Sequence, residues 1–79
     1  MATIYQPTQP TNLETRFTYH KPTEAAAQKY PILREKAKVL AYLIHDLCPD
    51  CRETSLALTK LEEVIMWANA GISRYPDDK

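Results

Sequence analysis

Hydrophobic residues recur at helical spacing in two long stretches of this chain. Between residues 32 and 48 they fall at alternating intervals of four and three, at Leu33, Ala37, Leu40, Ile44 and Leu47. Between residues 50 and 75 similar intervals separate Leu58, Leu61, Ile65, Ala68 and Ile72. Such stripes are typical of amphipathic helices that pack along one edge, and neither stretch alternates as a strand does. The pattern therefore predicts two long helices.

Prolines and their neighbours set the limits of these helices. Pro49 disfavours helical backbone at the preceding residue, so we expect the first helix to end at or just before Cys48. Asp50 followed by Glu53 resembles a capping box and predicts the start of the second helix. Because the link between them is then very short, the two helices are expected to lie antiparallel as a hairpin.

Pro31 interrupts the first helical stretch. The preceding segment, Thr23 to Tyr30, contains three consecutive alanines and follows Pro22, which favours a helix start. Either a short helix ends near residues 28–30 and a second begins at Pro31, or one helix runs from about Thr23 and bends at Pro31. We favour the single bent helix.

The length of the chain, 79 residues, allows one small domain. We expect a flexible N-terminal arm over residues 1–15, a helical hairpin domain over residues 16–75 and a tail over residues 76–79. The overall fold class is predicted to be all-α.

The chain has more apolar residues than one hairpin can bury. Val39, Leu43, Val64 and Trp67 lie beside the two stripes, on faces that two helices leave open. We predict that this surplus face mediates assembly into a symmetric homo-oligomer. The alternative is that the N-terminal arm folds over it.

Composition excludes several classes of function. Ten basic and ten acidic residues leave no net charge, whereas a non-specific binder of nucleic-acid polymers needs a cationic surplus. Gly71 is the single glycine, and glycine-rich phosphate loops need several. No apolar run approaches the roughly 20 residues that span a bilayer, and no secretory signal opens the sequence. We therefore expect a cytoplasmic protein with neither a nucleic-acid polymer nor a membrane as partner.

A basic and aromatic segment precedes the first long helix, and its notable residues are Arg16, Phe17, Tyr19, His20 and Lys21. Cations bind phosphates and aromatic faces stack on nucleobases, so this composition suits a small anionic nucleotide. Arg34 and Lys38, four residues apart on one helix face, could add phosphate contacts. A loop with Phe17 buried as an anchor and scattered surface charge is the simpler interpretation from these residues alone.

The other reactive side chains form no recognisable catalytic or metal site. Cys48 and Cys51 have the spacing of redox and zinc motifs, but a structural zinc needs two further ligands and no thioredoxin-like context is present. Glu62 and Glu63 are adjacent on a helix and point about 100° apart, so they are not a convergent acid–base pair. We interpret the cysteine pair as incidental, and expect no enzyme activity, no metal and no cofactor.

Arg74 lies near the end of the second predicted helix. In a symmetric oligomer, copies of this arginine could gather around an axis, which is unfavourable unless an anion lies among them. This geometry indicates a second candidate anion site.

Several segments together resemble one family. They are Arg16-Phe17-Thr18-Tyr19-His20, Leu33-Arg34-Glu35-Lys36-Ala37-Lys38, Cys48-Pro49-Asp50, Ser55-Leu56-Ala57-Leu58-Thr59-Lys60-Leu61-Glu62-Glu63 and Met66-Trp67-Ala68-Asn69-Ala70. Over about residues 16–74 the chain is similar to the phage hairpin-domain sponge family, which includes the anti-CBASS cyclic-nucleotide sponge and the Thoeris anti-defence sponge. The chain lacks the longer extension associated with the Thoeris branch, which favours the anti-CBASS branch. Pro31 and Cys51 depart from the family pattern, which has a helix former and a serine there.

The resemblance implies a hexamer that binds cyclic di- and trinucleotides, such as 3′,3′-cGAMP, without cleaving them, in the cytoplasm of the infected bacterium. For the dinucleotide it implies a pocket between protomers, lined by Tyr19, His20, Arg16, Phe17 and either Arg34 or Lys38. For the trinucleotide it implies an axial site lined by Arg74, Asn69 and Ser73. The alternatives are a helical interaction module with no small ligand, or a sponge for a Thoeris signal of the cyclic ADP-ribose type.

Overall fold

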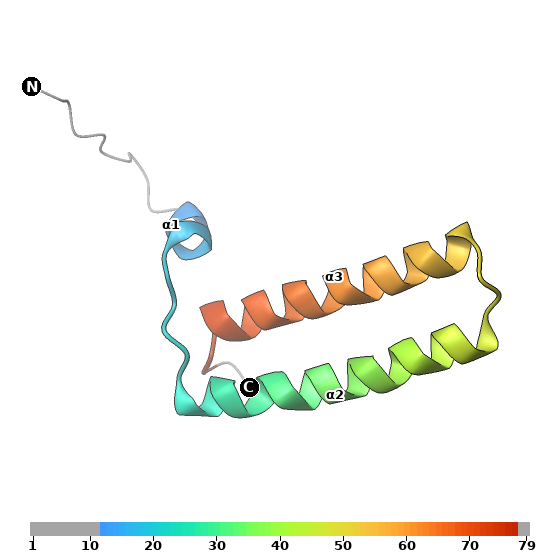
Figure 1. Cartoon of the computed structure of the whole chain (residues 1–79). Coiled ribbons are helices and arrows are strands. Elements are labelled where there is room, and N and C mark those ends of the chain that lie inside the picture. Colours follow the sequence, from blue (N-terminus) through green and yellow to red (C-terminus); the bar gives the residue numbers. More distant parts are fainter. Residues whose placement is uncertain (1–11, 78–79) are drawn as a thin grey trace, which may run out of the picture.

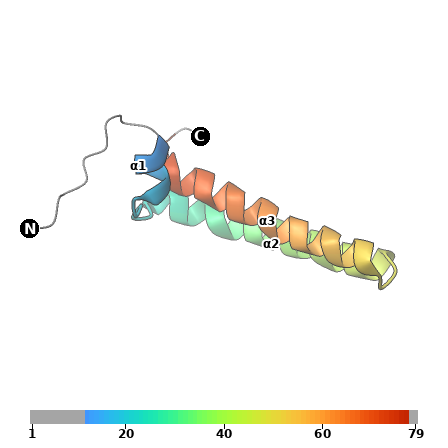
Figure 2. The same cartoon turned by 90° about the horizontal axis from the view of Figure 1, so that it is seen from above.

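The computed structural model describes residues 12–77, which form three helices and no strand (Figure 1). Helix α1 spans Asn12–Phe17, α2 spans Glu24–Leu47 and α3 spans Arg52–Arg74. Helices α2 and α3 run antiparallel and contact each other, and α1 lies at the end of the hairpin where α3 finishes (Figures 1 and 2). The predicted all-α class and the antiparallel hairpin are therefore confirmed.

Helix α2 is one continuous helix that runs through Pro31. It is capped by Thr23, whose Oγ1 accepts a hydrogen bond of 3.0 Å from the backbone N–H of Ala26. Pro31 has no N–H to donate to the carbonyl of Ala27, but both residues are exposed, so water can bind that carbonyl. One helix capped by Thr23, rather than two separate helices, is thus confirmed, and Figure 1 shows α2 as one unbroken ribbon.

The link between the long helices begins where Pro49 predicts. Cys48 ends α2, and its backbone N–H donates to the carbonyl of Ile44 at 3.0 Å. The predicted capping box of Asp50 and Glu53 is wrong, because α3 begins at Arg52 and its N-cap residue is Cys51.

Thr54 holds this link together in place of the predicted box. Its Oγ1 donates a hydrogen bond of 2.6 Å to the carbonyl of Pro49 and lies 3.3 Å from Cys51 Sγ. The thiol of Cys51 makes no capping hydrogen bond to the start of α3. Sulfur is a weak acceptor, so a hydroxyl one turn later makes the side-chain contact to the link.

Helix α1 lies in a region where the sequence predicts an arm. Residues 12–15 of the expected arm form its first turn, and residues 1–11 lie outside the described residues, as do residues 78–79 of the expected tail. Leu13 and Phe17 are four residues apart, so they share one face of α1. A helix of one and a half turns is too short to show a hydrophobic period, which is why the pattern misses it.

The facing edges of α2 and α3 follow most of the predicted stripes. All five residues of the second stripe are half-buried, as are Leu33, Ala37 and Ile44 of the first. Leu40 and Leu47 are exposed instead, and Ala41 takes the inner position. A strict heptad pattern drifts from a straight helix, so the true edge moves by one residue near the middle of α2.

The hairpin buries very little of its apolar surface. Ala26 is the one fully buried apolar residue in the described part of the chain. Val39, Leu43, Val64 and Trp67 are all exposed, and Trp67 has 65% of its surface accessible. The predicted surplus apolar face is therefore present, and the chain has no second layer of its own among residues 12–77 to cover it. Neither α2 nor α3 is long and apolar enough to cross a membrane.

Thr54→Val should lower the free energy of unfolding by about 1 kcal/mol, because the carbonyl of Pro49 loses its hydrogen-bond donor while the side-chain volume is kept. Urea denaturation followed by circular dichroism measures the change. Thr59→Val, on the exposed face of the same helix, is the matched control and should change stability by less. Equal effects of the two substitutions would show that the Thr54 hydroxyl does not hold the link.

Gly71→Ala should raise the free energy of unfolding by about 0.5–1 kcal/mol. Gly71 lies inside α3, and a Cβ built there meets no atom within 4 Å, so the better helix former costs no steric strain. Thermal denaturation of the two proteins at equal concentration measures the difference. A fall in stability would contradict this account and show that another molecule packs against Gly71 in solution.

Candidate functional site

A groove runs along one face of the hairpin between α2 and α3. Its larger part has a volume of about 480 Å³, and its smaller part, nearer the helix link, has about 320 Å³. Lys38, Ala41 and Leu58 line both parts, so the two form one continuous hairpin groove. This volume is in the range of small-molecule sites.

The hairpin groove has an apolar floor and a charged rim. The floor consists of Ala37, Ala41, Leu58, Leu61 and Ile65. Arg34 and Lys38 contribute two cations from α2, while Glu62 and Met66 line the opposite side from α3. Neither Arg34 nor Lys38 forms a salt bridge with another described residue, so both cations are available for an anion.

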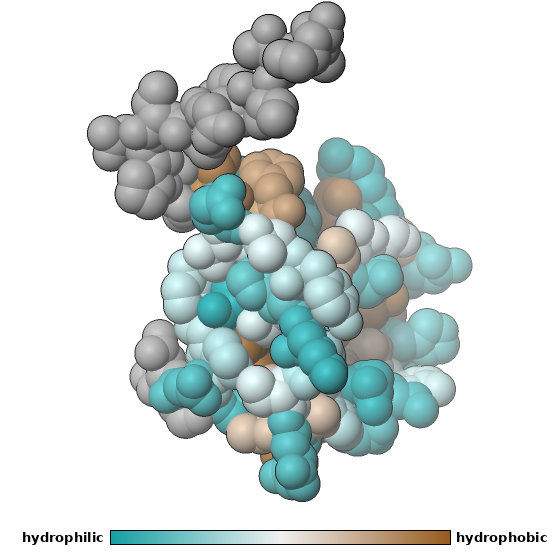
Figure 3. Space-filling model, turned by 90° about the vertical axis from the view of Figure 1, so that its left-hand side faces the viewer, coloured by the Kyte–Doolittle hydropathy of each residue, from teal (hydrophilic) through white to brown (hydrophobic). Residues whose placement is uncertain are grey.

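The basic and aromatic segment lies elsewhere, around α1. The guanidinium of Arg16 lies 5.5 Å from the centre of the Phe17 ring, and Phe17 is 78% exposed. Phe17 is therefore not the buried anchor of the simpler sequence interpretation. Figure 3 faces this end of the molecule and shows apolar side chains open on the surface near α1.

Tyr19 and His20 follow α1 in the segment that leads to α2. Tyr19 is 82% exposed, so its ring can stack on a base without any rearrangement. Nε2 of His20 donates a hydrogen bond of 2.6 Å to the carbonyl of Thr15, which fixes the ring against the end of α1. Its Nδ1 then remains available to a ligand.

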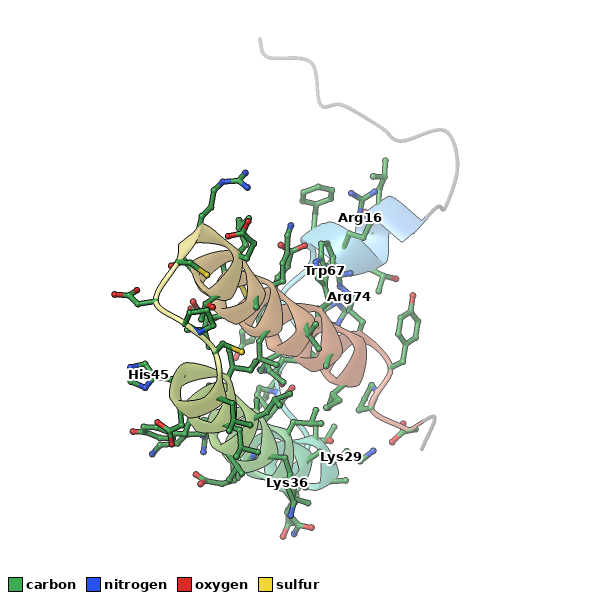
Figure 4. The ribbon with its side chains drawn as sticks, turned by 90° about the vertical axis from the view of Figure 1, so that its right-hand side faces the viewer. Arg16, Lys29, Lys36, His45, Trp67 and Arg74 are labelled. Carbon is green, nitrogen blue, oxygen red and sulfur yellow. The ribbon has the colours of Figure 1, made fainter. Side chains whose placement is uncertain are left out.

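One chain does not bring the predicted dinucleotide contacts together. Arg34 and Lys38 line the hairpin groove, but Arg16, Phe17, Tyr19 and His20 do not. Arg16 lies on α1, at the end of the hairpin where α3 finishes with Arg74 (Figures 1 and 4). The phosphate-binding and base-stacking candidates thus form two separate regions of the chain.

The predicted trinucleotide contacts occupy the last two turns of α3. Asn69, Ser73 and Arg74 are all half-buried. Asn69 and Ser73 are four residues apart and share a face, whereas Arg74 points about 100° away from Ser73. The Oδ1 atom of Asn69 is buried without a hydrogen-bond partner in the described part of the chain, which leaves an acceptor in need of a donor.

Two residues of the hairpin groove are not among the ligand contacts that the sequence predicts. Tyr42 and His45 line its smaller part. Their spacing is a sequence signal that could identify them. Intervals of four, four and three residues along α2 separate Arg34, Lys38, Tyr42 and His45, so the four share one side of the helix. Arg34 and Lys38 are predicted as phosphate contacts because both are permanent cations, whereas the rings of Tyr42 and His45 indicate no phosphate. No cluster of three or more potential metal ligands occurs among residues 12–77.

The sequence from residue 9 to residue 73 matches the family model described as "Acb2/Tad1, hairpin domain". The chain belongs to this family. The match spans α1 and α2 and ends one residue before the end of α3, so the domain named in the family description includes both the hairpin groove and the α1 region. Comparisons with curated proteins and with solved structures gave no match.

Membership in the Acb2/Tad1 hairpin family confirms the resemblance noted in the sequence.

Proposed function

We propose that this protein is a sponge for the cyclic nucleotide signals of bacterial anti-phage defence. It binds cyclic di- and trinucleotides in the cytoplasm of the infected host and withholds them, uncleaved, from the effectors that they activate in CBASS. The observation that carries this proposal is the match of residues 9–73 to the Acb2/Tad1 hairpin domain. The exposed cations and aromatic rings of the chain supply the chemistry that such ligands need.

The dinucleotide pocket is completed by two copies of the chain. A base stacks on Tyr19, with Arg16, Phe17 and His20 beside it, and a phosphate binds Arg34 or Lys38. Because these two groups lie in separate regions of one chain, the partner's copy of the α1 region provides the stacking half. The pocket therefore forms only in an assembly, for which we propose a symmetric hexamer.

Exposed apolar side chains support this assembly. Leu43, Val64 and Trp67 gain stability only when another surface covers them, because residues 12–77 contain a single buried apolar residue, Ala26. Self-association needs no further partner and completes the core that one hairpin lacks.

A second site binds the cyclic trinucleotide near the symmetry axis. Asn69, Ser73 and Arg74 lie at the end of α3, where an anion neutralises the neighbouring arginines of several copies. The Oδ1 of Asn69 is buried without a partner among the described residues, so the Asn69 side chain must turn outward before it accepts a hydrogen bond from a ligand.

Sequestration requires binding groups but no chemical step. Glu62 is the one carboxylate along the described walls of the hairpin groove, and a general acid–base mechanism with paired carboxylates needs a second one nearby. A sponge therefore lowers the free concentration of its ligand by mass action, in proportion to the number of binding sites present.

A second candidate function is a helical interaction module without a small ligand. The exposed face around Val39, Leu43 and Trp67 favours it, since a partner protein could cover that face instead of another copy. A Thoeris signal of the cyclic ADP-ribose type is the alternative ligand for the sponge.

Calorimetry with 3′,3′-cGAMP, cyclic tri-adenylate and a cyclic ADP-ribose isomer tests the sponge function. We expect heat from at least the first two ligands, and intact ligand on chromatography after the protein is digested. Recovery of linear nucleotide would indicate an enzyme. If none of the three ligands produced heat, the sponge function would be wrong and the interaction module would take its place.

Tyr19→Ala should weaken binding of 3′,3′-cGAMP by about 1–3 kcal/mol, the worth of one stacked base, while Tyr19→Phe should retain most of the affinity. Arg74→Ala should spare this ligand and reduce binding of cyclic tri-adenylate. The same calorimetric titrations measure all three variants. Parallel loss of both ligands in Tyr19→Ala and in Arg74→Ala would contradict two independent sites.

Multi-angle light scattering of the ligand-free protein should give a mass several times the 9.1 kDa of one chain. Trp67 is the single tryptophan of the sequence and is exposed in one chain, so its fluorescence should shift to longer wavelength when dilution dissociates the assembly. A monomer at every concentration would contradict a pocket shared between copies and favour the interaction module.

A further inference from the structure

The hairpin groove extends beyond the two cations that we assign to phosphate binding. Past Lys38 it continues toward the helix link, and Tyr42 and His45 line this smaller part. Neither residue has a role in the pockets described above. The extension is open to a ligand, because the Tyr42 side chain is 62% exposed.

The order of residues along α2 matches the order of groups in a nucleotide. Arg34, Lys38, Tyr42 and His45 lie on one side of the helix, at successive intervals of about one turn. Lys38 and Tyr42 are about 6 Å apart along the helix axis. This spacing is comparable to that between the phosphate of a nucleotide and its base, so a phosphate held by Lys38 brings a base toward Tyr42.

The floor of this extension is suited to a flat ring. Ala41 and Leu58 form it, and the short side chain of Ala41 leaves room beside Tyr42. Nδ1 of His45 lies 3.3 Å from Oδ1 of Asp46, which orients the imidazole at the far end. The carboxylate of Asp46 also disfavours a second phosphate there, so an uncharged base fits better than another anion.

We propose that Tyr42 forms a second base-stacking subsite in the hairpin groove, with Lys38 holding one of the two phosphates that join the nucleosides of a cyclic dinucleotide. This inference rests on the proposed sponge function and adds a contact to it. One base stacks on Tyr19 of the partner copy, and the other stacks on Tyr42 and lies against Ala41. A ligand with a single base fills only one of the two subsites.

Calorimetry with 3′,3′-cGAMP on the full-length assembly tests this subsite. Tyr42→Ala should raise the dissociation constant by roughly tenfold or more, while Tyr42→Phe, which keeps the aromatic face, should stay within about twofold of wild type. Tyr75→Ala is the matched control, because Tyr75 is also an exposed tyrosine but does not line the hairpin groove. It should leave the affinity for this ligand unchanged.

Ala41→Leu provides a second, independent variant. A larger side chain on the groove floor takes the space of the base, so it should weaken 3′,3′-cGAMP binding without removing any polar contact. Light scattering is measured for every variant alongside calorimetry. Unchanged mass and unchanged thermal stability, together with reduced affinity, support the subsite in each case.

The outcomes separate this inference from the proposed function. Wild-type affinity in Tyr42→Ala, together with loss of binding in Tyr19→Ala, would overturn the second subsite and leave the sponge intact. A changed mass in Tyr42→Ala or Ala41→Leu would overturn it as well, because the hairpin groove would then be an interface between copies. Absence of 3′,3′-cGAMP binding by the wild type would overturn both.

Discussion

The contact between the facing edges of α2 and α3 is the interaction on which the rest of this structure depends. It joins Leu33, Ala37 and Ile44 to the stripe on α3, and it leaves these residues only half-buried. Within residues 12–77 no element closes over the outer faces of α2 and α3, so the hydrophobic gain of this part of the chain stays small. The same contact creates the hairpin groove, because the short side chains of Ala37 and Ala41 leave open space between the two helices.

In the proposed function, a single arrangement accounts for both the low burial of apolar side chains and the separation of the predicted ligand contacts. Arg34 and Lys38 line the hairpin groove, while Tyr19 is displayed beside α1, and both regions are accessible in one chain. In the proposed assembly, several copies cover one another's apolar surface, and a stacking ring of one copy meets the cations of another. In this proposal the stability of the assembly and the formation of the pocket come from the same contacts, so a weakened interface also weakens ligand binding.

The sequence predicts the features that depend on helical periodicity and fails where a single local contact decides. The stripe on α3 follows from helical spacing, and the end of α2 at Cys48 follows from the backbone limits of a residue that precedes proline. Thr54, not the Asp50–Glu53 pair, stabilises the link, because the chain after Pro49 places the Thr54 hydroxyl 2.6 Å from a carbonyl. Helix α1 is too short to have a period. The separation of Tyr19 from Arg34 depends on how α1 and the segment after it lie relative to the hairpin, and no local sequence pattern predicts that arrangement.

The charge distribution explains how a neutral chain can favour a compact ligand over a polymer. The cations of the hairpin groove are Arg34 and Lys38, within about one helical turn of each other, with His45 near its end. Polymer binding gains affinity from many successive phosphate contacts, and a short groove with two fixed cations offers few of them. A cyclic dinucleotide has two phosphates and two bases within a small volume, so it can use every cation and ring that such a pocket presents. The absence of net charge is therefore compatible with tight binding of this ligand class, provided that the cations and the aromatic faces converge from different copies.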